Sequence, residues 1–421
     1  MKKVREGYKM SELGEIPEEW SIVKLSDLSQ KIGDGLHGTP KYVENSDYYF
    51  INGNNLVCGK VELYEDTKMV SEEDYIKNNK DLNENSLLIS LNGTIGNVAY
   101  YNNEKIMLGK SSGYINLKGN INKKYIYYVL KTNTVLEYFN KELTGTTIKN
   151  LSLSTLRNTP IPLPNIREQE KIALILSTVD EQIDNVDALI EKNKELKKGL
   201  MQTLLTKGIG HTKFKRSEIG EIPEEWEVKK VGDICEVKGG KRLPKGYQLE
   251  DEDNAFPYIR VADMYMGGIR QDDIKYVPKD IVDKIKNYKI SKDDLFISVA
   301  GTLGIVGQIP CELDGANLTE NADKLCNIQI NKLYLMKVLQ SNIIQSIIEA
   351  EKTKSAQPKL ALTRIKEFLI PVPSDREQVK IASILMEIDE RINVYENKKN
   401  KLEMLKKGLM QKLLTGKIRA I

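Results

Sequence analysis

Residues 165–206 read NIREQEKIALILSTVDEQIDNVDALIEKNKELKKGLMQTLLT, and residues 374–415 read SDREQVKIASILMEIDERINVYENKKNKLEMLKKGLMQKLLT. The two stretches share REQ, KIA and KKGLMQ in register, so that Arg376 stands 209 positions after Arg167. Chance does not produce a match of this length at a constant offset. The chain is therefore an internal duplication, and its two halves can be compared with each other.

Each copy has the pattern of one long helix. Apolar residues recur at steps of four and three, the spacing of a narrow seam that faces a partner helix. The expected seam consists of Ile172, Leu176, Val179, Ile183, Val186, Ile190 and Leu200 in the first copy and Ile381, Leu385, Ile388, Ile392, Leu402 and Leu409 in the second. A helix over all 42 residues of a copy is roughly 60 Å long, longer than a small globular domain. We therefore expect two spacer helices that pair antiparallel about a pseudo-two-fold axis. The alternative is two amphipathic helices lying on separate cores.

Local signals mark the helix ends and one unusual position inside each helix. Asn165 and Ser374 are candidate N-caps, each followed by a glutamate at the capping-box spacing. Gly199 and Gly408 lie inside the helices, where glycine costs about 1 kcal/mol relative to alanine. Close crossing of the two helices is the simpler explanation for these glycines, and packing of another protein is the alternative.

The duplication extends to the globular parts. The sequence LGEIPEEW at residues 13–20 recurs as IGEIPEEW at residues 219–226, and each Gly-Glu-Ile-Pro run is expected to form a turn. Trp20 and Trp226, the only tryptophans, are expected to anchor the cores. Strand patterns occupy residues 48–53, 86–93, 96–101 and 256–261, and helix patterns occupy residues 123–131, 135–141 and 331–349. These patterns predict an α+β fold, with two mixed, mostly-β globular domains separated by an antiparallel coiled coil.

Composition narrows the classes of function. The 421 residues are 40% hydrophobic and 29% charged, with a net charge of +3, which permits a local nucleic-acid-binding patch without requiring one. The four cysteines form no CxxC pair and are expected to be reduced thiols of a cytoplasmic protein. Two histidines make a metal site unexpected. The sequence contains no GxxxxGK(S/T) loop and no HExxH motif, and no GxGxxG motif follows a predicted strand. We therefore expect no cofactor, no metal and no catalysis by this chain.

The whole chain resembles the specificity subunit of type I restriction-modification systems. The resemblance is carried by the paired IPLP and IPVP entries before REQ, the KKGLMQ ends, the GTIG and GTLG turns and the two GEIPEEW leaders. It implies two target-recognition domains that read a bipartite, asymmetric site in double-stranded DNA. It also implies partners: methyltransferase subunits, expected to be two, and restriction subunits held through the assembled complex. A two-module scaffold protein without DNA contact is the alternative.

The expected domain boundaries follow the repeat. Residues 1–163 form the first target-recognition domain, 164–210 the first long helix, 211–372 the second target-recognition domain and 373–421 the second long helix. Residues that suit DNA contact are donors and acceptors on projecting loops, with basic side chains around them. In the first half these candidates are His37, Thr39, Lys41, Tyr42, Asn52, Asn54, Asn55, Asn92, Thr94, Lys110, Ser111, Ser112, Tyr114, Thr146, Thr147 and Lys149. In the second half they are Lys238, Lys241, Arg242, Lys245, Tyr247, Arg260, Asp263, Thr302, Asn317, Thr319, Asn321, Lys352, Lys354, Gln357 and Lys359.

Overall fold

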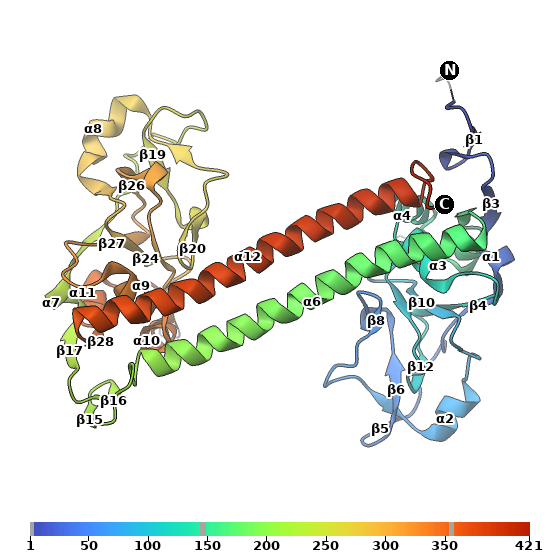
Figure 1. Cartoon of the computed structure of the whole chain (residues 1–421), viewed down its shortest axis with the longest axis horizontal. Coiled ribbons are helices and arrows are strands. Elements are labelled where there is room, and N and C mark those ends of the chain that lie inside the picture. Colours follow the sequence, from blue (N-terminus) through green and yellow to red (C-terminus); the bar gives the residue numbers. More distant parts are fainter. Residues whose placement is uncertain (1–3, 144–148, 353–357) are drawn as a thin grey trace. The chain divides into compact units, whose positions relative to one another are not determined.

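The computed structural model describes residues 4–143, 149–352 and 358–421. It divides into two compact units of interleaved sequence: unit 1 contains Met1–Asp187 and Asn397–Ile421, and unit 2 contains Ala188–Glu396. Each unit holds one globular lobe, part of helix α6 (Ile166–Leu204) and part of helix α12 (Asp375–Leu413) (Figure 1). Both helices have 39 residues, which confirms the two long helices expected from the repeat.

The lobe of unit 1 is built on two four-stranded sheets. One has the order β11-β10-β13-β4 and is antiparallel; the other has the order β12-β6-β9-β5 and contains one parallel pair, β12 with β6. Two-stranded pairs β1-β2, β3-β14 and β7-β8 complete the lobe. The strands are β1 (Tyr8–Ser11), β2 (Gly14–Pro17), β3 (Ser21–Lys24), β4 (Ser29–Asp34), β5 (Tyr42–Val43), β6 (Tyr48–Ile51), β7 (Leu56–Val57), β8 (Lys60–Val61), β9 (Met69–Val70), β10 (Ser86–Ser90), β11 (Val98–Tyr100), β12 (Ile106–Leu108), β13 (Ser112–Leu117) and β14 (Pro160–Leu163). The short helices are α1 (Leu25–Leu28), α2 (Glu72–Lys77), α3 (Lys123–Leu130), α4 (Asn133–Glu142) and α5 (Leu153–Arg157).

The lobe of unit 2 repeats this plan. Its sheets have the orders β18-β27-β24-β25 and β22-β19-β26-β23, and the second again contains one parallel pair, β19 with β26. Pairs β15-β16, β17-β28 and β20-β21 complete it. The strands are β15 (Phe214–Ser217), β16 (Gly220–Pro223), β17 (Glu227–Lys230), β18 (Glu236–Gly239), β19 (Pro257–Ile259), β20 (Met264–Tyr265), β21 (Gly268–Ile269), β22 (Lys275–Tyr276), β23 (Lys289–Ile290), β24 (Leu295–Ser298), β25 (Val306–Gln308), β26 (Ala316–Leu318), β27 (Ala322–Cys326) and β28 (Leu369–Val372). The short helices are α7 (Val231–Ile234), α8 (Val282–Ile285), α9 (Lys332–Gln340), α10 (Asn342–Lys352) and α11 (Leu362–Lys366).

The long helices run antiparallel within unit 1. Lys406 of α12 pairs with Asp180 of α6, and Lys399, seven residues earlier, pairs with Asp187, seven residues later, at 2.7 Å. The residue numbers therefore fall on one helix as they rise on the other. In unit 2, Lys197 of α6 pairs with an aspartate of α12 at 2.5 Å, and this pair is the equivalent of Asp180 with Lys406 at the repeat offset.

Each lobe shares its main core with the helices. The cluster around Trp20 in unit 1 includes Ile172 and Leu176 of α6, and the cluster around Trp226 in unit 2 includes Leu385 of α12. Both tryptophans are buried, as expected from the sequence. The first turns of each helix are thus held by a lobe as well as by the partner helix.

Three local expectations were wrong. The Gly-Glu-Ile-Pro runs are strands β2 and β16, because Gly14 and Gly220 take positive φ at the hairpin turns and leave the next residues extended. The segment 331–349 forms two helices, α9 and α10, that meet at Ser341. Glu168 does not close a capping box; its amide N–H donates to Asn165, while its carboxylate binds other partners.

Candidate nucleic-acid interface and docking grooves

Several loops of unit 2 meet at one end of the sheet β18-β27-β24. The amide N–H of Lys241 donates to the carbonyl of Leu318 at 2.8 Å, and that of Val299 donates to Asn321 at 2.7 Å. Ala300 forms an isolated bridge with Lys359. These contacts bring together the unit 2 recognition edge, defined as Lys241, Arg242, Thr302, Asn321 and Lys359.

Equivalent loops of unit 1 meet at the matching end of β4-β13-β10. The amide N–H of Gly53 donates to Ser111 Oγ at 3.0 Å, that of Leu91 donates to the Ser111 carbonyl at 2.9 Å, and that of Leu151 donates to the Leu91 carbonyl at 2.7 Å. The loop after β4 joins them through Gly35, whose N–H donates to the Ser112 carbonyl. The unit 1 recognition edge formed by these loops comprises His37, Asn54, Asn92, Thr94, Lys110, Ser111 and Lys149.

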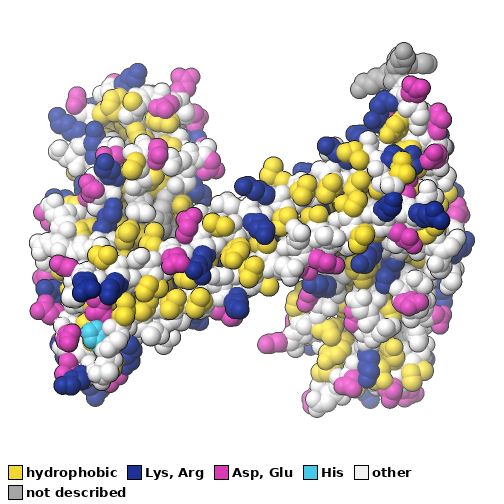
Figure 2. All heavy atoms as spheres, in the orientation of Figure 1, with side chains coloured by type: hydrophobic (Ala, Val, Ile, Leu, Met, Phe, Trp, Pro, Cys, Tyr) yellow, Lys and Arg dark blue, Asp and Glu magenta, His cyan; other side chains and the backbone are white. Residues whose placement is uncertain are grey.

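The charged side chains of the two edges are only partly neutralised. Arg242 donates to Glu320 Oε1 at 2.6 Å, yet its side chain is 78% exposed. The hydrogen bond to Glu320 raises the pKa of Arg242. His37 lies 2.5 Å from Asp34. On the face of each unit visible in Figure 2, basic and acidic side chains are interspersed, so any DNA contact depends on these local groups and not on a large positive field.

Asp323 lies at the root of the unit 2 edge, opposite Gly239 on the neighbouring strand. Its side chain is 5% exposed, and its carboxylate has no hydrogen-bond partner among the described residues. Burial raises the pKa of Asp323 to about 6, and the nearby charge of Lys359 opposes the rise. The equivalent strand position in unit 1 is Gly113, so this buried acid belongs to one half only.

Replacing Asp323 by asparagine is expected to stabilise unit 2 at pH 7. The folded-state pKa of Asp323 is raised above its ordinary value of 3.8, so the stability that the protonated group contributes is present below pH 4 and is lost as the pH rises to about 6. Asp323→Asn should therefore increase the free energy of unfolding by up to about 3 kcal/mol at pH 7 and by little at pH 4. Urea unfolding followed by Trp226 fluorescence at both pH values measures this.

The matched control is Asp294→Asn. Asp294 is also buried, but it accepts from the Ser291 amide at 2.9 Å and lies 3.7 Å from Lys324. Its replacement should destabilise unit 2. Equal losses of stability from both substitutions at pH 7 would contradict the account of Asp323.

A glutamate, buried in unit 1 and half-buried in unit 2, closes each unit where the end of one long helix meets the start of the other. In unit 1, Glu168 accepts from Trp20 Nε1 at 3.1 Å and from Arg419 Nε at 2.7 Å. Burial tends to raise the pKa of Glu168, but the hydrogen bonds from Arg419 and Trp20 outweigh it and lower that pKa. Arg419 also binds Glu19 at 2.7 Å. We call this group the unit 1 clasp.

The unit 2 clasp uses the equivalent glutamate with a different cation. Glu377 accepts from Trp226 Nε1 at 3.0 Å and from the amide of Ile209 at 2.9 Å. His211 Nε2 lies 3.0 Å from the same carboxylate, and Glu225 is 4.0 Å from the other ring nitrogen. A histidine of the segment after α6 therefore stands where an arginine of the segment after α12 stands in unit 1.

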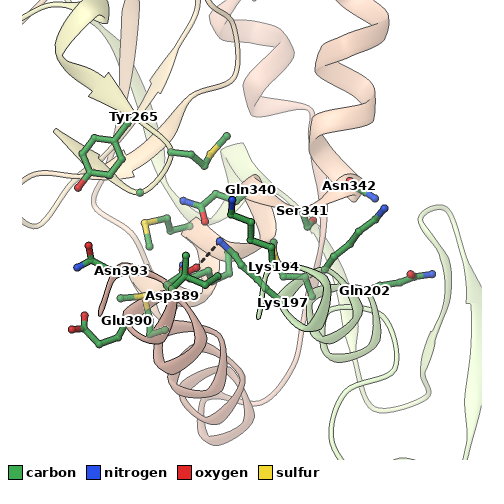
Figure 3. A pocket seen from close by; sticks show the side chains of 18 of the residues that line it. Lys194, Lys197, Gln202, Tyr265, Gln340, Ser341, Asn342, Asp389, Glu390 and Asn393 are labelled. Carbon is green, nitrogen blue, oxygen red and sulfur yellow. Dashed lines mark hydrogen bonds and ion pairs between the residues drawn. The ribbon is translucent and has the colours of Figure 1, made fainter. Parts of the chain in front are cut away.

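A groove of about 740 Å³ lies in unit 2 between the lobe and the two long helices. Helix α6 lines one wall, α9 and the β20-β21 hairpin line the opposite wall, and α12 closes the side (Figure 3). Lys197 reaches across to Asp389, as the dashed line in Figure 3 shows. Lys337 of α9, which is 2% exposed, donates to the other oxygen of Asp389.

Unit 1 has a groove of about 1180 Å³ in the equivalent place. Nine lining positions carry the same residue in both grooves at the repeat offset: in unit 2 they are Lys197, Lys198, Met201, Gln202, Thr206, Asn342, Asp389, Glu390 and Ile392, and in unit 1 they are Lys406, Lys407, Met410, Gln411, Thr415, Asn133, Asp180, Glu181 and Ile183. The duplication has therefore kept a common frame, while the walls supplied by the lobes differ.

A family model, the type I restriction modification DNA specificity domain, matches the chain twice, over residues 17–196 and 223–404. This chain belongs to the type I DNA specificity family. Specificity subunits of this family recognise DNA through two target-recognition domains, and catalysis is by partner subunits. Among the described residues, no helix is long and apolar enough to cross a membrane, and no three side chains are grouped to hold a metal ion.

Full-length relatives support the assignment. The putative type I restriction enzyme MjaX specificity subunit of Methanocaldococcus jannaschii is 31% identical, over 98% of this chain and 97% of that protein. The MjaVIII specificity subunit of the same organism is 28% identical, over 96% and 94%. The crystal structure of the S subunit from M. genitalium has the same fold, with a TM-score of 0.60 at 23% identity, over 94% of this chain and 96% of that one.

The DNA-contact candidates of this specificity subunit fall into three groups. Exposed side chains are His37, Thr39, Lys41, Tyr42, Asn54, Thr94, Lys110, Lys149, Lys238, Lys241, Arg242, Lys245, Tyr247, Thr302 and Lys359. Half-buried ones are Asn52, Asn92, Ser111, Arg260, Asn321 and Lys352. Thr146, Thr147, Lys354 and Gln357 lie outside the described residues.

The third group is buried, and most of its members have internal partners. Asn55 accepts from the Asn52 amide at 3.0 Å and donates to Glu62, and Asp263 accepts from the Arg260 amide at the equivalent turn. Asn317 donates to the Ile285 carbonyl at 2.8 Å. Ser112, Tyr114 and Thr319 are also buried. Asn55, Asp263 and Asn317 hold loops in place through these bonds, and no member of this buried group is among the proposed DNA contacts.

The expected helix seam is buried over most of its length. Ile172, Leu176, Val179, Val186, Ile190, Ile381, Leu385 and Ile388 are buried, whereas Ile183, Leu200, Ile392, Leu402 and Leu409 are half-buried. Close crossing of the helices at the glycines was wrong, because a Cβ added to Gly199 or Gly408 would have no neighbour within 4 Å. The sequence analysis also missed both clasps and Lys337. Identity of Glu168 with Glu377 was a signal for the clasps, but it fitted a helix cap equally well.

Proposed function

We propose that each recognition edge reads one short segment of duplex DNA and that the two segments differ, giving a bipartite, asymmetric site. The proposal rests on one observation: equivalent loops converge in both units, but they carry different residues. The unit 2 edge presents Lys241 and Arg242, and basic side chains such as these suit contacts with guanine and phosphate. The unit 1 edge presents His37, Asn54 and Asn92, and amides suit adenine.

The proposed contacts are the exposed or half-buried members of the two edges. Basic residues outside the edges, such as Lys41 and Lys245, supply phosphate contacts, which position the protein without selecting a sequence. We further propose the domain boundaries 1–163, 164–210, 211–372 and 373–421, which place one edge in each target-recognition domain. Action on cellular DNA places the complex in the cytoplasm.

Arg242→Ala is expected to relax one base pair of one half-site. The Arg242 side chain is 78% exposed on the unit 2 recognition edge. A bidentate contact from arginine to guanine contributes about 1–3 kcal/mol of discrimination. The chain would be co-expressed with its methyltransferase subunit, and methylated adenines would be mapped across the host genome. The half-site read by unit 1 should stay unchanged.

Arg364→Ala serves as the control, because Arg364 lies on α11, is not a member of the unit 2 recognition edge, and pairs with Glu351 at 3.3 Å. An unchanged methylation motif in the Arg242→Ala map would remove this residue from the interface. Methylation without any shared motif in the wild-type map would instead count against sequence-specific recognition as a whole.

We also propose that two methyltransferase subunits assemble with the chain, one at each groove, and that restriction subunits join through this complex. Two copies of one partner need two similar surfaces, and the common frame of the grooves provides them. Exposed helix positions also match between the halves without internal explanation: Leu196 with Leu405, Lys198 with Lys407, Gly199 with Gly408 and Gln202 with Gln411. Native mass spectrometry of the co-purified complex would give the stoichiometry directly.

A further inference from the structure

The floors of the two grooves differ at one decisive position. In unit 1, Tyr128 of α3 donates to Asp180 Oδ2 at 2.7 Å, and Lys406 binds the other oxygen. In unit 2, the residue equivalent to Tyr128 at the repeat offset is Lys337. One carboxylate therefore neutralises one ammonium group in unit 1, but it is shared by two ammonium groups in unit 2.

The surplus charge in unit 2 is local. The whole linings are similarly balanced, with four basic against three acidic side chains in unit 2 and seven against six in unit 1. The two grooves differ in where the additional positive charge lies, because in unit 2 it includes the buried Lys337 at the floor of the groove. Burial lowers the pKa of Lys337, and the charge of Asp389 opposes this. A charge at a partly enclosed floor attracts an opposite charge more strongly than one on the exposed rim.

The side chains beside this floor suit an incoming acid. Figure 3 shows Lys197 on α6 facing the pocket, which Gln340 and Asn393 also line. Lys194, one turn earlier on α6, lines the pocket too and pairs with Glu191 at 2.9 Å. In unit 1 the position of Asn393 is occupied by Asp184, a carboxylate that pairs with Lys60 at 3.3 Å. An acidic group entering the unit 1 groove meets this additional negative charge, whereas the unit 2 groove offers a neutral amide.

We propose that the unit 2 groove receives a carboxylate side chain of the docked methyltransferase at Lys197, and that it is therefore the tighter groove and fills first. This rests on the proposed docking of one methyltransferase at each groove. The carboxylate accepts a charge-assisted hydrogen bond from Lys197 while Asp389 remains bound to Lys337. The same side chain of the second methyltransferase copy finds a neutralised floor in unit 1 and binds there more weakly.

The internal repeat supplies a reciprocal test. Lys337→Tyr gives unit 2 the floor of unit 1, and Tyr128→Lys gives unit 1 the floor of unit 2. Each full-length variant is titrated with its methyltransferase subunit, and the two stepwise dissociation constants are measured by native mass spectrometry. We expect about a tenfold gap between the two wild-type steps beyond the statistical factor, the size expected for one charge-assisted hydrogen bond. Lys337→Tyr should weaken the first step about tenfold, and Tyr128→Lys should tighten the second.

A milder variant guards against misfolding at the buried position. Asn393→Asp places the unit 1 carboxylate in the unit 2 groove without touching Lys337, and it should weaken the first step in the same direction. The proposal would be overturned if the wild-type chain bound two methyltransferase copies with equal intrinsic affinity. It would also be overturned if the Asn393→Asp and Lys337→Tyr chains folded and kept the wild-type dissociation constant of the first step. Inorganic sulfate at constant ionic strength should compete with the first step; competition without any effect of the three substitutions would assign the groove to free anions. No methyltransferase binding at all would count against the proposed function instead.

Discussion

Arg419→Ala is expected to lower the free energy of unfolding of unit 1 by about 3–5 kcal/mol at pH 7. The reason is Glu168, which is 3% exposed and would keep a charged carboxylate with only the Trp20 indole and backbone as donors. Because the folded-state pKa of Glu168 is lowered, the contribution of this pair is present above the ordinary glutamate pKa of 4.5 and is lost as the pH falls below it. The difference between variant and wild type should therefore shrink toward pH 3.

The two tryptophans allow this effect to be assigned to one unit. In a Trp226→Phe background, Trp20 fluorescence during urea unfolding reports unit 1 alone. Arg364→Ala, which removes a half-exposed arginine of unit 2, should leave that transition within about 0.5 kcal/mol. If Arg419→Ala lowered the free energy of unfolding by less than about 1 kcal/mol, the clasp would contribute no more than an exposed ion pair on the surface does.

Asp389→Asn is expected to have the second large effect, about 3–5 kcal/mol on unit 2 at pH 7. The substitution removes the counter-charge of Lys337, which is 2% exposed, and leaves a buried ammonium group. The equivalent substitution, Asp180→Asn, leaves a neutral tyrosine hydroxyl and the better-solvated Lys406, so about 1 kcal/mol is expected in unit 1. Trp226 fluorescence in a Trp20→Phe background, and Trp20 fluorescence in the reciprocal background, measure the two losses.

The pH dependence of the Asp389→Asn penalty provides an independent check. Burial holds the pKa of Lys337 below the ordinary lysine value of 10.5, and loss of Asp389 removes the charge that opposes this depression. The unfolded state then binds more protons than the folded state, so the stability of the variant should rise as the pH increases from 7 toward 10. A penalty that stays constant over this range, or equal losses from Asp389→Asn and Asp180→Asn, would contradict a buried charge as its cause.

The sequence alone predicted the two long helices and two lobes, because helical spacing is a local pattern and the repeat shows it twice. Ile172, Leu176 and Val179 show their helical face by spacing, and they are buried in the structure. Trp20 and Trp226 show their burial by residue type. Strand order was not predicted, because the parallel pair β12 with β6 depends on contacts between residues more than 50 positions apart.

The functional surfaces could be predicted only as sets of loops. Asn55 and Asp263 are polar residues in exposed-looking segments, and nothing in their sequence distinguishes a base reader from a residue that caps a turn. Glu168 and Arg419 are 251 positions apart, so their pairing has no local signature. Lys337 stands in an apolar helix pattern, and its partner Asp389 lies on another element. Only a comparison of equivalent positions in the two halves would have drawn attention to it.

The glycines that interrupt the two long helices have a consequence for motion. Among the described residues, no atom lies within 4 Å of a Cβ added at Gly199 or Gly408, and glycine gives up more backbone entropy on becoming helical than any other residue. The helical turns around Gly199 in α6 and Gly408 in α12 should therefore open more readily than the neighbouring turns. The two turns lie at equivalent positions of the repeat. We expect local opening of these turns to let a lobe change its angle on bound DNA without unfolding. Amide protons near the turns should then exchange with solvent ahead of those in the rest of the helix.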